Sequence, residues 1–147
     1  MKKKYDCYIA SGWFNEAQAQ DLENIKKVLT ELKLTFFSPK DECKIDSSAS
    51  IEKRNEVFNL NLTSINDCTI LISNPRDKDM GTVFETGYAY ANSIPILYYH
   101  DQPKRFNLML SQSGVAVSTS PEDLKGVLKE LFFNNSSYTR PYTGDIE

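Results

Sequence analysis

Short apolar segments rich in aromatic and β-branched residues recur along the chain and predict strands. Each segment ends at small, polar or proline residues, which are typical of the turn after a strand. The third segment is almost entirely apolar, which indicates a strand covered on both faces of its sheet. The five predicted strands span residues 5–9, 34–37, 69–72, 94–99 and 115–117.

Between these segments, apolar residues recur at helical spacing. Asn15 can cap a first helix, with Gln18 reaching back to its start. Ser120 followed by Pro121 predicts the start of the last helix. A helix is also expected over residues 82–92. The expected inner faces are Leu22, Ile25, Leu29 and Leu32 in the first helix, Ile51, Phe58, Leu62 and Ile65 in the second, and Leu124, Val127, Leu128 and Leu131 in the last.

Strands that alternate with helices predict an α/β fold, in which helices cover both faces of a parallel sheet. The chain has no internal repeat, so residues 1–147 are interpreted as one domain of ordinary size. Residues 40–49 form a polar loop, and the polar tail 134–147 is a candidate for contact with a neighbouring subunit. Ligands of such sheets bind beyond the carboxyl ends of the strands, so the loops after the first three strands are the places to search.

Charge and cysteine content narrow the function classes. A net charge of -3 disfavours nucleic acid and acidic membranes as partners, because both reward clustered cations. No segment resembles a signal peptide or approaches the roughly 20 apolar residues of a transmembrane helix. The three cysteines have no metal-ligand spacing, and His100 is the only histidine, so we expect reduced thiols, no metal site and a cytoplasmic protein.

The loop after the first predicted strand carries Gly12, Trp13 and Phe14. A dinucleotide fingerprint needs several glycines here, and the chain has neither that motif nor a phosphate-binding P-loop, so no cofactor is expected. Two aromatic side chains at the ligand edge of the sheet could stack on a nucleobase. The alternative is that both rings pack beneath the loop, as buried aromatics commonly do.

Two carboxylates, Asp79 and Glu85, lie around the start of the third helix. A carboxylate in the first turn of a helix is stabilised in its charged form by the helix dipole and free backbone N–H groups. Glu85 is therefore expected in that first turn and ionised, as a nucleophile must be. The alternative is that these acids only improve the helix start.

Three further polar or flexible side chains are candidates for ligand contact. Asn61 lies on the side of its helix that should be buried, and a buried amide needs a hydrogen-bond partner, either a backbone carbonyl or a ligand. Asn107 could bond sugar hydroxyls, and Met109 could cover an apolar ring.

Together these motifs resemble the nucleoside 2-deoxyribosyltransferase family. The resemblance covers most of the chain in order. Its motifs are Tyr8 with Gly12-Trp13-Phe14, Asp79 with Gly81 and Glu85-Thr86-Gly87-Tyr88-Ala89, and Asn107-Leu108-Met109.

The resemblance implies a flavodoxin-like three-layer fold with a five-stranded parallel sheet. It also implies a homo-oligomer, typically a hexamer built from dimers, with shared sites. Glu85 would be the nucleophile, Tyr8 would position it, and Asp79 would contact the base and shuttle its proton. Asn107 of a neighbouring subunit would hold the sugar's 5'-hydroxyl. Many members have aspartate where this chain has Asn61, and an amide can orient a base but cannot carry its proton.

The sequence therefore predicts transfer of 2-deoxyribose between nucleobases by a retaining double displacement through Glu85, without cofactor or metal. Its small-molecule partners would be 2'-deoxynucleosides and free bases. One alternative is a hydrolase of 2'-deoxynucleoside 5'-monophosphates, for which the serines at 47, 48 and 50 could bind phosphate. A non-catalytic nucleotide-sensing module is a further alternative, but it would not need Asp79 and Glu85 together. A flavodoxin-type electron carrier is the last, but the first loop lacks a run of phosphate-binding hydroxyls.

Overall fold

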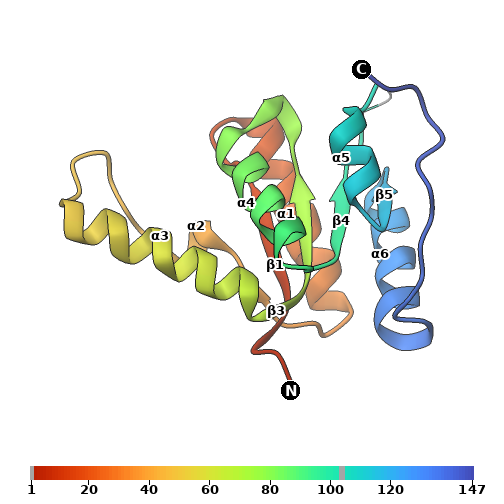
Figure 1. The fold of residues 1–147 in the computed structure, drawn as a ribbon, viewed down its shortest axis with the longest axis horizontal. Helices are drawn as coiled ribbons and strands as arrows, with labels where there is room; N and C mark the ends of the chain where they lie inside the picture. Colours follow the sequence, from red (N-terminus) through yellow and green to blue (C-terminus); the bar gives the residue numbers. More distant parts are fainter. Residues whose placement is uncertain (1, 103–104) are drawn as a thin grey trace.

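Five strands form an all-parallel sheet in the order β2-β1-β3-β4-β5 in the computed structural model, which describes residues 2–102 and 105–147 (Figure 1). This order confirms the predicted flavodoxin-like fold. The strand that follows β1 in sequence, β2, lies on one side of it, and β3 and the later strands lie on the other side. The carboxyl ends of β1 and β3 therefore border a natural crevice. The strands are β1 (Tyr5–Ser11), β2 (Phe36–Phe37), β3 (Cys68–Asn74), β4 (Ile96–Tyr99) and β5 (Ala116–Ser118).

Helices form a layer on each face of this sheet (Figure 1). One layer consists of α1 (Glu16–Glu31) and α6 (Pro121–Lys129), which pack on each other and on the sheet. The other layer consists of α3 (Ile51–Asn66), α4 (Met80–Ala91) and α5 (Leu108–Ser113). Three short pieces complete the fold: α2 (Pro39–Glu42), a 3₁₀ turn (Arg76–Lys78) and a π-helical turn (Glu130–Asn134).

Alternation along β1 assigns its side chains to the two layers. Cys7 and Ile9 lie in the core beneath α1 and α6. Tyr8 and Ala10 lie in the core beneath α3 and α4. The side chain of Tyr8 therefore faces α4, the helix that carries Glu85.

The predicted helix caps are present, with two differences. Asn15 accepts from Gln18 N at 2.9 Å, but the Gln18 side chain reaches Phe14 N rather than Asn15 N. Helix α4 begins at Met80, with Asp79 as its cap, two residues earlier than predicted. The prediction that Glu85 lies in the first turn is therefore wrong, and Glu85 lies in the second turn.

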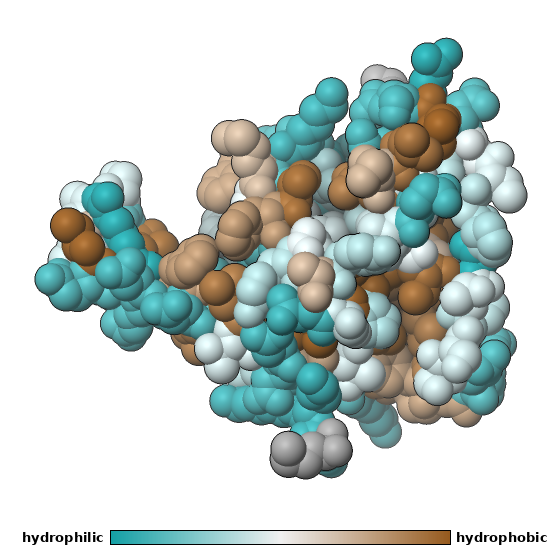
Figure 2. Space-filling model, viewed as in Figure 1, coloured by the Kyte–Doolittle hydropathy of each residue, from teal (hydrophilic) through white to brown (hydrophobic). Residues whose placement is uncertain are grey.

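Helix α3 corrects the expectation for the second helix. Ile65 is buried, but Ile51 and Phe58 are 71% and 49% exposed, because α3 projects away from the sheet and only its C-terminal part packs on the body (Figure 1). Hydrophobic side chains gather over α4 and the adjoining part of α3 (Figure 2), where the rings of Phe58 and Phe84 lie 5.9 Å apart. Apolar periodicity marks a face that avoids water, but it does not say what covers that face.

Other boundaries differ by a few residues. The second predicted strand is reduced to β2, and α2 begins in place of the first part of the polar loop 40–49. Pro95 precedes β4 instead of opening it. Helix α5 was not expected. Within the described residues, no helix combines the length and apolar character needed to cross a membrane.

The C-terminal tail packs along its own chain. Arg140 forms an ion pair with Asp123, and its backbone N–H donates to Val115 O at 2.8 Å. Further on, Phe106 and Ile146 form a parallel bridge. The tail therefore ends beside α5, next to Asn107.

Candidate active site

A hydrogen bond between Tyr8 and Glu85 forms the centre of the site. The Tyr8 hydroxyl donates to Glu85 Oε2, joining β1 to α4 across 77 residues of chain. The Tyr8 ring is fully buried and stacks on Phe37, with ring centroids 5.5 Å apart. Burial and the Glu85 charge raise the pKa of Tyr8 far above its usual range, so the hydroxyl keeps its proton and remains a donor.

The protonation of Glu85 is set by its environment in the fold. Burial raises its pKa from 4.5 to about 7, the hydrogen bond from Tyr8 opposes this rise, and the neighbouring charge of Asp79 adds to it. The sequence-based expectation of a fully ionised carboxylate is therefore corrected. At neutral pH the free protein holds Glu85 in both protonation states.

Asp79 occupies the cap position of α4. Its Oδ2 accepts from the backbone N–H of Thr82 at 3.0 Å and from the Thr82 hydroxyl at 2.7 Å. Both bonds use one oxygen, and no described residue donates to Asp79 Oδ1. The side chain is half-buried. One carboxylate oxygen is thus fixed by the helix start, and the other can meet a ligand.

The two aromatic residues after β1 differ in their placement. Trp13 is half-buried and packs against the core, whereas Phe14 is 72% exposed, and their rings lie 5.0 Å apart. Trp13 also lines a hollow of about 410 Å³. The other residues that line it are Lys40, Cys43, Lys44, Ile45 and Asp46.

Gly12 leaves room for the side chain that holds this loop. A Cβ at this position would lie 2.7 Å from Gln18 Oε1, the atom that accepts from Phe14 N. We expect Gly12→Ala to lower the free energy of unfolding by about 1–3 kcal/mol, because Gln18 must leave a well-packed position. Urea unfolding measures this change.

The matched control is Gly126→Ala in α6, where no atom lies within 4 Å of the added Cβ. It should raise stability by about 0.5–1 kcal/mol, as alanine does in a helix interior. Equal effects at both positions would contradict the proposed role of Gly12.

Asn61 has a partner that the sequence did not suggest. The Cys43 thiol donates to Asn61 Oδ1 at 3.2 Å, in place of the expected backbone carbonyl or ligand. Burial, followed by the charges of Glu42 and Glu85, raises the pKa of this thiol, so Cys43 lies within electrostatic reach of Glu85. No sequence signal pointed to Cys43, because a cysteine without metal-ligand spacing indicates no particular site.

Asn107 and Met109 lie elsewhere in this chain. Asn107 caps α5, accepting from Leu110 N at 3.2 Å, and Met109 is 76% exposed. Both line a cavity of about 1160 Å³ formed with the loop after β3 and the C-terminal tail. Tyr8 and Glu85 are not among the described residues of its lining, although Lys78 and Val83, on either side of Asp79, are.

The described residues contain no cluster of three or more potential metal ligands. The three cysteines are unpaired and buried. The arrangement offers carboxylate chemistry: a half-buried glutamate held by a tyrosine, and a second carboxylate within electrostatic reach.

Comparison with known proteins identifies the family of this chain. The family model of nucleoside 2-deoxyribosyltransferases matches residues 7–120, which include Tyr8, Asp79 and Glu85. The chain belongs to this family. A search of proteins with curated functions finds no match.

Solved structures agree with this assignment. The structure of a 2-deoxyribosyltransferase from Bacillus psychrosaccharolyticus is similar over 93% of this chain and 98% of that protein, with 26% identity and a TM-score of 0.80. A conserved protein from Enterococcus faecalis has 15% identity and a TM-score of 0.66, with coverage of 84% and 96%. A CMP N-glycosidase from Clostridium botulinum has 15% identity and a TM-score of 0.56, with coverage of 84% and 97%. The last two likenesses concern the fold alone.

Proposed function

We propose that this protein is a nucleoside 2-deoxyribosyltransferase that exchanges the bases of 2'-deoxynucleosides. The hydrogen bond between Tyr8 and the half-buried Glu85 carries this proposal, because it orients one carboxylate in surroundings that raise its pKa. Asp79 supplies a second carboxylate close enough to affect the pKa of Glu85. Two carboxylates with different environments are the requirement of retaining glycosyl transfer.

In the first half-reaction, ionised Glu85 attacks the anomeric carbon of the deoxyribose. The glycosidic C–N bond breaks, its electron pair goes to the base nitrogen, and protonated Asp79 donates a proton to the departing base. The transition state has oxocarbenium character and is stabilised by the adjacent carboxylate. The products are a deoxyribosyl ester of Glu85, a free base and an ionised Asp79.

In the second half-reaction, another base binds where the first one left. Its nitrogen attacks the anomeric carbon, the ester C–O bond breaks, and the electron pair returns to the Glu85 carboxylate. Ionised Asp79 accepts the proton that the incoming base loses. Two inversions give net retention, and the enzyme returns to its starting protonation state.

Tyr8 would also select the sugar. Its hydroxyl lies against the carboxylate that attacks the anomeric carbon, where a 2'-hydroxyl would compete for space and hydrogen bonds. This contact favours 2'-deoxynucleosides over ribonucleosides. Trp13 and Phe14 would flank the base, and Asn61, fixed by Cys43, would orient it.

We further propose that the single domain works as a homo-oligomer in the cytoplasm. Exposed apolar side chains on α3 and α4, including Phe58 and Phe84, form a surface typical of subunit contacts. Asn107 and Met109 line a cavity whose described lining does not include Glu85, and a neighbouring subunit would supply them to the sugar and base of this site. The nearby tail 134–147 would contribute to the same contact.

Hydrolysis of a nucleoside 5'-monophosphate is a second candidate function. The observation that favours it is the hollow beside Trp13, since Lys40 and Lys44 both line it and could bind a phosphate. Two of the three serines have hydroxyls that already bond within the fold. Ser48 bonds Asp46, and Ser50 caps α3.

The test is to incubate the protein with thymidine and adenine, and separately with deoxyinosine and adenine, and to separate the products by liquid chromatography. New deoxyadenosine supports the transferase, and the productive pair identifies the base class. Free base without a new nucleoside, especially from 2'-deoxynucleoside monophosphates, would favour the hydrolase instead. No product from any donor would contradict both.

Tyr8 should control the pH dependence of exchange. With a donor whose base leaves without a proton, wild-type kcat/KM should rise with pH up to about 7, the pKa of Glu85, and then level off, because attack then needs only the ionised form of Glu85. Tyr8→Phe removes a hydrogen bond to that form, so the pKa of Glu85 should rise further. We expect kcat/KM at pH 7 to fall about 10- to 100-fold, with partial recovery at pH 9.

Tyr5→Phe is the matched control, since Tyr5 packs edge-on against Phe37 and does not bond Glu85. Its pH profile should follow that of the wild type. An unchanged profile in Tyr8→Phe would contradict the role assigned to Tyr8.

A further inference from the structure

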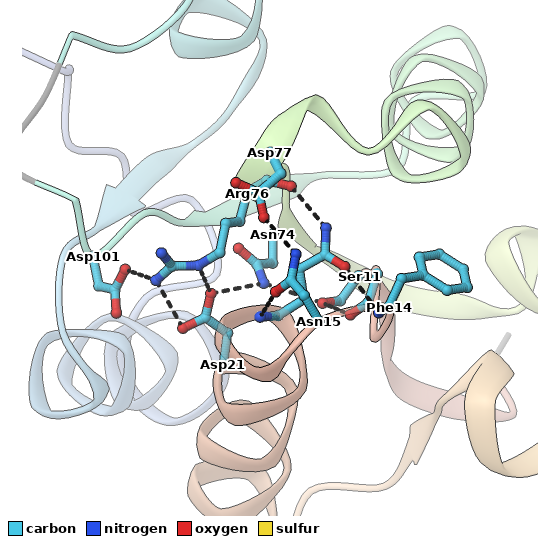
Figure 3. Close-up of polar contacts among 10 residues, drawn as sticks. Ser11, Phe14, Asn15, Asp21, Asn74, Arg76, Asp77 and Asp101 are labelled. Atoms are coloured by element: carbon cyan, nitrogen blue, oxygen red, sulfur yellow. Dashed lines mark hydrogen bonds and ion pairs between the residues drawn. The ribbon is translucent and has the colours of Figure 1, made fainter.

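A buried ion pair lies beside the loop that carries Asp79 (Figure 3). Asp21 of α1 is only 3% exposed. Its two carboxylate oxygens accept from Arg76 Nε and Nη2, the second at 3.1 Å. Asn74, the last residue of β3, also donates to Asp21 Oδ2, at 3.2 Å. The carboxylate is thus bonded on both oxygens within the fold.

The same network extends to both sides of the loop. Arg76 forms a second ion pair with Asp101, which follows β4. Gln18 donates to the Arg76 carbonyl at 3.2 Å, and Asn15 donates to Asp77 Oδ2 at 2.9 Å. The start of α1 and the end of β4 therefore hold residues 76 and 77 together (Figure 3).

These bonds hold a strained backbone. Asp77 and Lys78 have φ values of 61° and 55°, in the left-handed region that residues with side chains rarely adopt. Each such residue costs about 1–3 kcal/mol unless the surrounding structure enforces it. The strained pair directly precedes Asp79, so any relaxation of this turn moves the Asp79 carboxylate.

Stability alone does not account for a buried ion pair here. Removing two charges from water costs free energy that their attraction seldom exceeds, and apolar replacements are often equally stable. The neighbouring inward positions of α1, Leu22 and Ile25, are apolar. Asp21 instead provides a charged, bidentate anchor for the guanidinium of Arg76, which fixes both distance and orientation.

We propose that the Asp21–Arg76 ion pair positions Asp79 for proton transfer to the leaving and incoming bases. Asp21 and Arg76 are positioning residues, because they act through the loop. This inference rests on the proposed transferase function and on the role of Asp79 in it. It assigns a function to residues that the sequence motifs do not include.

The experiment compares donors that differ in their need for an acid. 5-Fluorouracil leaves with less help from a proton than thymine, and an N7-methylated guanine leaves without one. The matched pairs are therefore thymidine with 5-fluoro-2'-deoxyuridine, or deoxyguanosine with its N7-methyl derivative, according to the base class that the wild type uses. Steady-state kcat and KM are measured for both donors of the pair.

Asp21→Asn preserves the size of the side chain but removes its charge and replaces one acceptor oxygen with an NH2 donor. We expect kcat for the ordinary donor to fall about 10- to 100-fold, within the range that acid–base catalysis contributes. KM should change little, and kcat for the activated donor should fall less than about 3-fold. Asp101→Asn, which breaks only the outer ion pair, should show the same donor selectivity with a smaller loss.

Two comparisons make the result decisive. Glu31→Gln removes an exposed ion pair with Lys125 at the other end of α1 and should change neither donor. Asp79→Asn should show the largest difference between the donors, with a large fall in kcat for the ordinary donor and little change for the activated donor. The inference would be overturned if Asp21→Asn and Asp101→Asn lowered kcat equally for both donors, or did not lower it at all. If Asp79→Asn lowered kcat equally for both donors, the proposed mechanism would be contradicted instead.

Discussion

Replacing Glu85 with glutamine is expected to reduce base exchange by at least about 10³-fold, the scale on which removal of a covalent nucleophile reduces turnover. An amide cannot attack the anomeric carbon under these conditions, so no deoxyribosyl ester forms. The amide oxygen can still accept from Tyr8, which leaves the contact between β1 and α4 in place. Exchange is measured by chromatography, and the ester by mass spectrometry of protein incubated with donor alone.

The same substitution should stabilise the fold at alkaline pH. The folded protein binds a proton on Glu85 more tightly than the unfolded chain does, because burial raises the pKa from 4.5 to about 7. The contribution of Glu85 to stability is therefore fully present below pH 4.5 and is lost as the pH rises through about 7. Since glutamine has no charge to bury, Glu85→Gln should be more stable than the wild type at pH 8 by up to about 3 kcal/mol. Near pH 4.5 the difference should disappear.

Glu56→Gln is the control for this pair of measurements. Glu56 lies on the exposed part of α3 and forms a surface ion pair with Lys53. Neither exchange nor the pH dependence of unfolding should change appreciably in this variant. Wild-type exchange rates in Glu85→Gln would refute the assignment of the nucleophile.

Asp79→Asn is expected to lower kcat for ordinary donors by ~10²- to 10⁴-fold, the contribution typical of a general acid. Asparagine caps a helix about as well as aspartate, so the bonds to Thr82 and the start of α4 should persist. The loss of activity therefore reflects the missing proton donor and not a change in the fold. Circular dichroism and thermal unfolding check that the fold is retained.

The variant has a second signature in the pH profile. The charge of Asp79 contributes to the raised pKa of Glu85, so its removal should move the acidic limb of kcat/KM to lower pH. Asp67→Asn, at the opposite end of the sheet before β3, should leave that limb unchanged. A limb that stays in place in Asp79→Asn would show that the two carboxylates do not interact.

Local features of the fold could be predicted from the sequence because they depend on neighbouring residues. Short apolar segments identified the five strands, and their alternation with helical patterns identified the parallel arrangement of the sheet. Asn15 and Ser120 identified two helix starts by side-chain capping. Motif resemblance identified the family, which the family model confirms over residues 7–120.

The tertiary structure decided what depends on residues distant in the chain. The pairing of Tyr8 with Glu85 spans 77 residues, and that of Arg76 with Asp21 spans 55. Burial by the surrounding layers, which no local pattern encodes, raises the pKa of Glu85 despite its place near a helix start. The projection of α3 likewise leaves Phe58 exposed on a face that its spacing marked as buried. Periodicity and capping are properties of a few adjacent residues, whereas distances, burial and charge environments arise only when the elements pack together.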